Sequence, residues 1–365
     1  MLRAPGPLLL EGRLVPRAPR TSLHPSPGRG QRRPATSRRS SAPPAGNLPA
    51  AHVAEIQRSR LLAGAVRAID EHGYAHTTVA QITGRSRVSR RTFYELFENR
   101  EACLTALVED VVGSIEQELA EADLQRLPWQ ERIRGGLAVI LAFIDREPTL
   151  ARVCVVQAAQ GGASILAYRR RILDRLAEAL DEGRGKGPRA GDCSPLTAEG
   201  LLGAACGILD ARLAQGVHEP LTGLLGELMS MIVLPYLGPA AARREQSRPT
   251  PVPGAAPAGR PPLMAAADSD PLQEIPMRLT YRTAKVLECI AAHPGISNRM
   301  VADRAGISDQ GQISKLLARL ERLELAENRG DGQLRGEPNA WTLTALGEQV
   351  TRRLSASSQQ RRQAA

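Results

Sequence analysis

The amino-acid sequence predicts a mostly helical protein that ends in a small domain of helices and a β-hairpin. Apolar residues recur with helical spacing through residues 51–238, and no strand-like alternation competes with them. Two stretches, 1–50 and 239–275, are dominated by Pro, Ala, Gly and Arg and lack this periodicity. We therefore expect a disordered arm and a semi-extended linker around folded blocks at 51–238 and 276–355, with a disordered tail at 356–365.

The chain is basic, but most of its excess charge lies in the predicted arm. The formal net charge is +10, and residues 1–50 hold nine Arg against the single acid Glu11. The rest of the chain is therefore close to neutral. Net charge alone gives weak support for a polyanionic partner.

The five cysteines lie far apart, and no two of them form a Cys-x-x-Cys motif. This spacing favours free thiols over disulfides or a zinc site, and it is typical of a cytoplasmic protein. The longest apolar runs reach about half of the roughly 20 residues that a membrane span requires, so we expect no membrane helix. We also expect no catalytic activity, metal ion or cofactor, because paired carboxylates and nucleophile patterns are absent.

The first folded block begins with a predicted three-helix domain at residues 51–103. An apolar stripe that includes Leu62, Val66 and Ile69 predicts its first helix, which should end at Gly73. This helix gives the following two short helices a surface on which to pack.

A helix-turn-helix pattern follows. Thr78 can cap a short helix, and Ser89 can cap another after a tight turn at Arg87. Phe93 and Phe97 would then anchor this last helix in the core. Its opposite side should therefore face outward.

That outward side is rich in hydrogen-bond donors and, on this reading, free of acid. A helix of this kind fits the major groove of duplex DNA, where Arg can bond two guanine acceptors at once. Arginines in and before the helix would neutralise phosphates. A solvated basic helix is the alternative. The candidate DNA-binding residues are Thr78, Arg85, Arg87, Ser89, Arg90, Arg91, Thr92, Tyr94 and Arg100.

From Leu61 to Glu101 the order and spacing of residues resemble the tetracycline-repressor (TetR) family of transcriptional regulators. The resemblance implies an all-α fold with a TetR-like helix-turn-helix domain at 51–103 and a ligand-binding and dimerisation domain at 104–238. It also implies that Thr78 and Tyr94 contact phosphates, whereas Arg90, Arg91 and Thr92 face bases.

The sequence departs from the family pattern at two positions. Arg87 replaces the usual glycine of the turn, so we expect it to adopt an unfavourable positive φ. Arg100 replaces the usual lysine, which keeps a cation at the start of the fourth helix.

The remainder of the first block predicts further helices at about 101–124, 130–145, 148–160, 164–183, 196–215 and 220–236. The family resemblance implies an effector pocket among the middle helices. Ordinary core packing explains its candidate lining residues equally well. These residues are Trp129, Phe143, Cys154 and Tyr168, with Ile140 beside them.

Residues 196–236 are expected to pair two protomers. Gly200, Gly203 and Gly207 would let backbones approach closely, and a leucine-rich helix follows them. Such a homodimer would hold two reading helices about 34 Å apart, at the spacing of DNA half-sites. The alternative is that both helices pack only within one protomer.

Residues 276–355 repeat the helix-turn-helix logic. Helices are predicted at 283–293, 297–305 and 309–323, then strands at 325–328 and 340–343 around a glycine-rich tip, and a last helix capped by Thr344. This order resembles a winged helix of the MarR-like type. A winged helix that docks a protein is the alternative. The residues implied to contact DNA are Gln310, Gln312, Ser314, Lys315, Arg329 and Arg335.

The sequence as a whole favours a bacterial, ligand-responsive, homodimeric repressor. Its partners would be a duplex DNA operator and an unidentified small-molecule effector. The alternative is a constitutive DNA-bridging or protein-interaction regulator that uses both helix-turn-helix domains without an effector. No residue pattern supports an enzyme built on a helical bundle.

Overall fold

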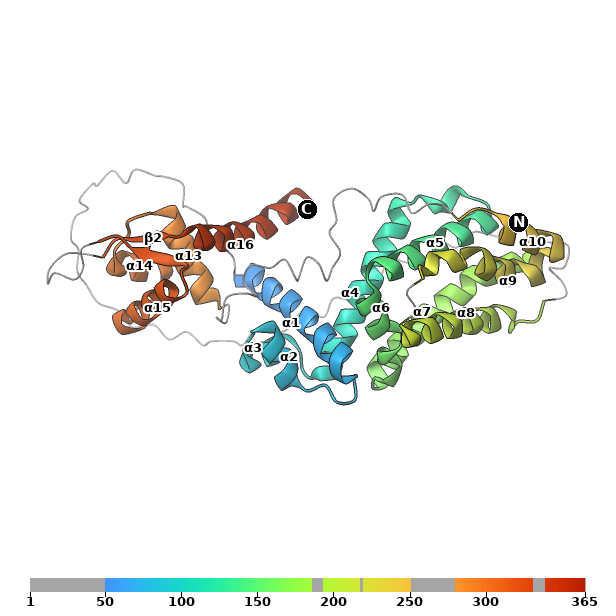
Figure 1. The fold of residues 1–365 in the computed structure, drawn as a ribbon, viewed down its shortest axis with the longest axis horizontal. Helices are drawn as coiled ribbons and strands as arrows, with labels where there is room; N and C mark the ends of the chain where they lie inside the picture. The colour runs from blue at the N-terminus through green and yellow to red at the C-terminus, as the bar shows by residue number, and fades with distance from the viewer. Residues whose placement is uncertain (1–49, 186–192, 217–218, 251–279, 331–338, 365) are drawn as a thin grey trace, which may run out of the picture. The chain divides into compact units, whose positions relative to one another are not determined.

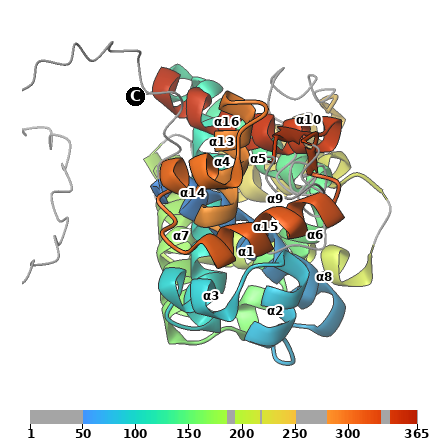
Figure 2. The ribbon, with the colours of Figure 1, turned by 90° about the vertical axis from the view of Figure 1, so that its left-hand side faces the viewer.

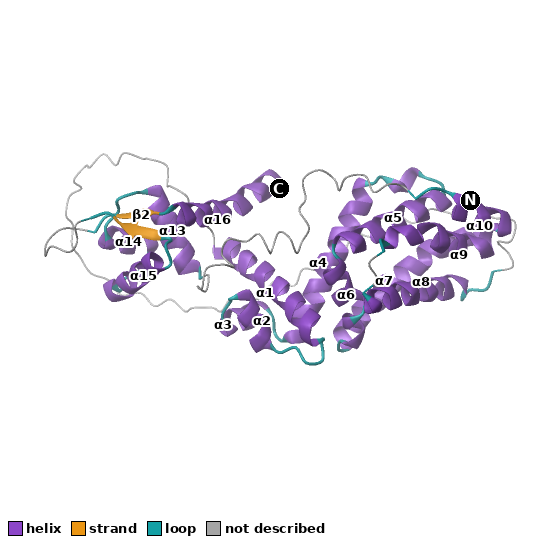
Figure 3. Cartoon of the chain, viewed as in Figure 1, coloured by secondary structure: helices purple, strands orange, loops and turns teal. Residues whose placement is uncertain are grey.

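A computed structural model describes most of the two predicted blocks, and its elements are almost all helical (Figure 3). The predicted arm and most of the predicted linker lie outside the described residues. In the last helix, side chains are described as far as residue 354. The described residues are 50–185, 193–216, 219–250, 280–330 and 339–364.

Three helices form what we call the head. They are α1 (Ala50–His72), α2 (Val79–Ser86) and α3 (Arg90–Leu96). Helix α1 ends directly before Gly73, as predicted. Both α2 and α3 pack on α1, and the two short helices lie next to each other in both views (Figures 1 and 2).

Helices α4 to α10 form what we call the body. The first six match the predicted helices closely, and short 3-10 turns connect parts of them where the structure describes the chain. The α-helices are α4 (Arg100–Glu121), α5 (Trp129–Arg146), α6 (Pro148–Val155), α7 (Ala163–Asp181), α8 (Thr197–Gln215), α9 (Leu225–Leu237) and α10 (Pro239–Ser247). The 3-10 turns are Leu124–Arg126, Gln157–Gln160, Glu182–Gly185 and Leu221–Leu224.

Two hydrophobic clusters hold these helices together. The first joins the head to α4, α5, α6 and α7, and it includes Leu61, Phe93, Phe143 and Ile165. The second lies between α5, α8, α9 and α10. The head therefore shares one continuous apolar core with part of the body.

Helix α10 corrects the predicted linker, which was placed at 239–275. Residues 239–247 are helical, Ala241, Ala242 and Glu245 are buried, and α10 packs on α9. The segment was misassigned because alanine is too small to produce an apolar stripe in the sequence.

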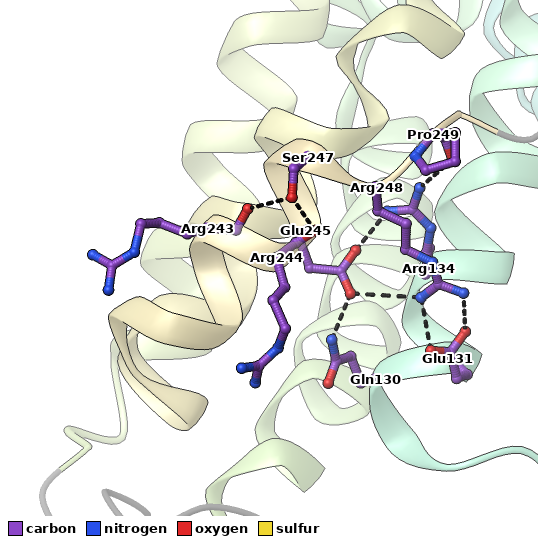
Figure 4. A network of polar contacts seen from close by, with 9 residues as sticks. All are labelled: Gln130, Glu131, Arg134, Arg243, Arg244, Glu245, Ser247, Arg248 and Pro249. Atoms are coloured by element: carbon purple, nitrogen blue, oxygen red, sulfur yellow. Dashed lines mark hydrogen bonds and ion pairs between the residues drawn. The ribbon is translucent and has the colours of Figure 1, made fainter.

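A buried network of hydrogen bonds and ion pairs holds α10 against α5 (Figure 4). The Glu245 carboxylate accepts hydrogen bonds from Arg134 and Gln130, both at 2.5 Å. Arg134 also donates to the carbonyl of Pro249, and Arg248 pairs with the neighbouring Glu131 of α5. Both Arg134 and Glu245 are buried, so this ion pair holds α10 against α5.

The C-terminal block contains α13 (Tyr281–Ala292), α14 (Asn298–Ala305), α15 (Gln310–Arg322) and α16 (Ala345–Ala364). Between α15 and α16 lie β1 (Ala326–Asn328) and β2 (Trp341–Leu343), paired antiparallel with Glu327 opposite Thr342. The Thr344 hydroxyl accepts the backbone N–H of Gly347 at the start of α16, which confirms the predicted cap. The order of helices and strands in this block is therefore the predicted one.

Helix α16 corrects the predicted disordered tail at 356–365, because the helix continues to Ala364. The last residues are polar and show no apolar stripe, but Ala, Gln and Arg are good helix formers. They extend a helix that begins in a packed core.

Among the described residues, no single helix is long and apolar enough to cross a membrane, although one pair bent by 116° passes that test by length and composition.

Candidate nucleic-acid interface

Helix α2 is fixed at its start by a reciprocal cap and along its length by close contact with α1. The Thr78 side chain accepts the backbone N–H of Gln81, and the Gln81 side chain accepts that of Thr78 at 2.7 Å. A Cβ on Gly64 of α1 would lie 2.9 Å from the Ile82 carbonyl oxygen and from the Ser86 Cβ. Only glycine allows α2 to lie this close to α1.

The turn between α2 and α3 has the strained backbone that the sequence predicts. Arg87 lies in the left-handed region with φ 52° and ψ 30°, a conformation that favours glycine. The adjacent Val88 is buried and holds the turn against the core. The turn therefore keeps its geometry despite an arginine in the glycine position.

Helix α3 is anchored by its aromatic side. Ser89 caps the helix by accepting the backbone N–H of Thr92 at 3.0 Å. Phe93 is fully buried and its ring contacts that of Phe97, with the ring centres 5.6 Å apart. This packing confirms the predicted inward face and fixes which residues α3 turns to solvent.

The outward face of α3 carries Arg90, Arg91 and Tyr94, and Tyr94 is 59% exposed. This face is not free of acid as predicted, because Arg91 donates to the exposed Glu95 one turn later at 2.8 Å. The hydrogen bond to Glu95 raises the pKa of Arg91. The (i, i+4) spacing of Arg91 and Glu95 is the sequence signal that indicates this pair.

Arg85, Arg87 and Thr92 of the head are less accessible to DNA, because they are partly buried or contact other parts of the protein. Arg85 forms an ion pair with Glu71 of α1, and one guanidinium nitrogen of Arg87 is buried without a hydrogen-bond partner. The hydroxyl of Thr92 lies 2.9 Å from that of Ser89, so it supports the cap. Among the described residues of α3, Arg90 is the exposed cation that makes no ion pair.

Arg100 has an internal role. Its guanidinium donates to the backbone carbonyls of Tyr74 at 3.0 Å and Thr77 at 2.5 Å, and it stacks on the Tyr74 ring. These contacts hold the segment that leads into Thr78 and the start of α2. Within the protein, Arg100 therefore positions the segment from which α2 starts.

The four candidate effector residues fall into different places. Phe143, Cys154 and Tyr168 belong to the cluster shared with the head. Trp129 lies in the second cluster, where it packs edge-on against Tyr236 and donates to the carbonyl of Ala179. Burial raises the pKa of the Cys154 thiol to about 12, so this side chain is a neutral apolar group.

Two polar contacts connect the head to the segment around α6. The side-chain oxygen of Gln157 accepts the backbone N–H of Tyr74 at 3.0 Å, and Arg152 of α6 pairs with Asp70 of α1. Neither connection could be predicted from the sequence, because partners more than 80 residues apart leave no periodic signal.

The glycines of α8 lie on an open face of the protomer. A Cβ added at Gly200, Gly203 or Gly207 would meet no atom within 4 Å. Helix α9, by contrast, is largely buried against α10 and α5. Of the two helices predicted to pair protomers, α8 is therefore the one with an open surface of small residues.

The C-terminal candidates cluster around the start of α15. Gln310, Gln312, Ser314 and Lys315 are all exposed, and Gln312 accepts a hydrogen bond from Arg282 of α13 at 2.7 Å. Exposed Arg329 follows β1 and pairs with Glu327. Arg335 lies outside the described residues.

Two short helices joined by a tight turn, the second with a buried aromatic side and an exposed basic side, define a helix-turn-helix domain of the class that binds duplex DNA. The family model described as "Bacterial regulatory proteins, tetR family" matches residues 61–107. Residues 61–107, which contain most of the head and the start of α4, thus match the TetR-family N-terminal DNA-binding domain.

Several solved structures are similar to this chain. The fatty acid degradation regulator FadR from Bacillus halodurans is 20% identical with a TM-score of 0.43, over 48% of this chain and 94% of that one. FadR from Bacillus subtilis in complex with stearoyl-CoA is 18% identical with a TM-score of 0.41, over 48% and 97%. RolR in complex with resorcinol is 23% identical with a TM-score of 0.38, over 55% and 98%. No curated protein matches the chain.

Proposed function

We propose that this protein is a homodimeric transcriptional repressor that binds a duplex operator through α3 and releases it when a small molecule binds the body. The observation that carries the proposal is the division of α3 into a buried aromatic side and an exposed side with Arg90 and Arg91. This side can enter a major groove, and its arginines can bond base edges and neutralise phosphates.

The contacts between head and body support a ligand-responsive mechanism. Phe143 and Tyr168 belong to the same apolar cluster as Phe93 of α3, so a molecule that displaces them acts on the core of the head. The Gln157 contact with Tyr74 fixes the turn before α2 at the same time. Stearoyl-CoA and resorcinol, which are bound in two of the similar proteins, serve as first probes of effector chemistry.

Dimerisation would supply the second reading helix. The open glycine face of α8 suits a close approach to the same helix of a second protomer. Two copies of α3 about 34 Å apart would then read the two halves of a palindromic operator.

The test is duplex binding to the promoter region of the protein's own gene, with salt titrated and a mixed-sequence duplex of equal length as the competitor. We expect affinity for the promoter to exceed affinity for the competitor by at least about a thousandfold, and to fall steeply with salt. Equal affinity for both duplexes would contradict operator recognition. Affinity independent of salt would contradict phosphate contact.

A second candidate function is a constitutive regulator that uses two helix-turn-helix domains without an effector. The succession of α14 and α15 in the C-terminal block favours it, because these helices repeat the arrangement of α2 and α3. This candidate would be supported if promoter binding is unchanged by every small molecule tested and the helix-turn-helix of the C-terminal block also binds DNA.

A further inference from the structure

Helices α14 and α15 form a second helix-turn-helix. Helix α14 ends at Ala305. Gly306 follows with a φ of +68°, which reverses the chain, and the buried Ile307 then anchors the turn. Asp309 caps α15 by accepting the backbone N–H groups of Gly311 and Gln312. These two hydrogen bonds lower the pKa of the Asp309 carboxyl, so it is an anion engaged with the helix start.

The packing of α15 fixes which side faces outward. Ile313, Leu317 and Leu320 are all fully buried and form the inner side. Directly opposite, at the same helical spacing, lies a row of exposed residues that we call the α15 surface. It consists of Gly311, Lys315, Ala318 and Arg322.

The chemistry of the α15 surface suits a duplex. Two cations alternate with two residues that carry little or no side chain, so the helix can approach a polyanion closely while Lys315 and Arg322 reach to its sides. The row contains no acid, and the one acid within α15, Glu321, lies off it. Exposed Arg319 adds a third cation beside the row.

Neighbouring elements hold polar groups beside the start of this helix. Arg282 of α13 donates to Gln312, and Asn298 of α14 donates to the hydroxyl of Ser314 at 3.4 Å. Asn298 also accepts the indole N–H of Trp341, which ties β2 to the same corner at 2.5 Å. The corner is therefore prearranged, with amides and a hydroxyl at positions where they can meet base edges or phosphates.

The base of the β-hairpin is equally ordered. The side-chain oxygen of Asn328 accepts the backbone N–H groups of Gly330 and Ala340, and its amide donates to Asn339. The strands thus leave the domain in a fixed direction, with Arg329 at their exposed end.

We propose that this domain is a winged helix whose α15 surface is a second binding site for duplex DNA, independent of α3. The charge and the small residues of the surface favour DNA over a protein partner. A protein-docking helix would instead be expected to present large apolar side chains, and the α15 surface has none. The inference goes beyond the proposed repressor, which reads DNA through α3 alone, and it names the residues of the second site that the second candidate function requires.

The test uses the full chain with the first site disabled by Arg90→Glu and Arg91→Glu. Its probe is a fluorescein-labelled mixed-sequence duplex of about 40 bp, followed by anisotropy at low salt. We expect this variant to retain salt-dependent binding. Adding Lys315→Glu and Arg322→Glu should weaken the remaining binding by at least about tenfold and reduce the slope of log K against log salt by about 2.

The matched control adds Arg352→Glu and Arg353→Glu on α16 instead, which changes the net charge by the same amount in the same domain. This pair should leave the remaining binding nearly unchanged. Circular dichroism confirms that each variant is folded.

Three outcomes would overturn the proposal. The first is that the variant with the first site disabled does not bind the duplex. The second is that its binding survives the substitutions on α15. The third is that the substitutions on α16 weaken its binding as much as those on α15. If binding survives while the α15 changes alter the protein's oligomeric mass, the surface docks protein instead. The chain with only α15 altered and α3 intact tests the proposed function separately, because its promoter binding depends on α3 alone.

Discussion

The guanidinium of Arg100 lies 4.4 Å from the centre of the Tyr74 ring and donates a hydrogen bond to the carbonyl of the same residue. Replacing Arg100 with Ala should lower the free energy of unfolding by about 2 kcal/mol, since a stacked cation and its hydrogen bonds to carbonyls are lost together. It should weaken binding to every duplex alike, because the segment before α2 loosens. Urea denaturation and anisotropy measure the two effects. Arg100→Lys keeps a cation and should lose less of both.

Substitutions of Arg91 and Glu95 should change DNA affinity in opposite directions. Arg91→Ala should cost operator binding about 1 to 3 kcal/mol and relax base preference at one position. Glu95→Ala should strengthen binding to all duplexes, because it removes an anion from the DNA-facing side and releases Arg91. The stability of either variant should stay close to that of the wild type, since the ion pair is exposed and screened by solvent. Weaker binding by Glu95→Ala would show that the pair is needed to position Arg91.

Thr78 combines two roles that a pair of substitutions separates. Thr78→Ala removes the cap of α2 and should lower stability by about 1 kcal/mol while weakening binding to all sequences. Thr78→Ser retains the hydroxyl and should preserve both properties. A change of base preference in Thr78→Ala, measured across single-base operator variants, would contradict a contact with phosphate.

The α8 face predicts the oligomeric state. Gly203→Glu has room in the protomer, so the fold should persist while the charge prevents two protomers from approaching. Light scattering should report a dimer for the wild-type chain and a monomer for this variant, with a parallel loss of operator affinity. Gly113→Glu on α4 is the matched control, because a side chain there also meets no atom within 4 Å. A dimer that survives Gly203→Glu would place the interface elsewhere.

The buried Arg134–Glu245 ion pair between α5 and α10 predicts that losing one partner costs more stability than replacing both. Glu245→Ala leaves the Arg134 guanidinium buried without its carboxylate and should destabilise the protein by about 3 to 5 kcal/mol. Replacing both, as Glu245→Leu with Arg134→Met, should restore most of that loss, because apolar groups of similar size need no partner. Thermal unfolding followed by circular dichroism measures both variants.

Two thiols predict a dependence on pH. Burial raises the pKa of both Cys103 and Cys154 to about 12, well above that of an exposed thiol. A group whose pKa is raised by folding stabilises the protein below its unfolded pKa, and this contribution is lost as pH rises towards the folded value. Stability should therefore decline from about pH 9 upward, and Cys103→Ala with Cys154→Ala should flatten that decline. Mass spectrometry after iodoacetamide at pH 8 should find the fully buried Cys103 thiol unmodified in the native protein.

The sequence contained enough local information to predict most helices and their caps. Thr78, Ser89 and Thr344 each precede a short polar-to-apolar transition, and each caps the helix it was expected to cap. Arg87 was expected at positive φ because it stands where a glycine is usual, and it lies there. Local rules of this kind depend only on neighbours within one turn.

What the sequence could not reveal depends on partners far along the chain. Nothing near Glu245 indicates that this acid is buried, because its partner Arg134 lies on another helix. Gly64 lies within an apolar stripe, and only the close approach of Ser86 explains why a residue without a side chain is required there. Trp129 shared the apolar character of the other effector candidates but packs in a separate cluster.

The apolar cluster that joins Phe93 to Phe143 has a mechanical consequence. Packed protein interiors are nearly incompressible, so volume added at one end of such a cluster must be accommodated by movement at the other. Helix α3 therefore packs on the same apolar cluster as the middle of the body, and its orientation depends on how completely that cluster is filled.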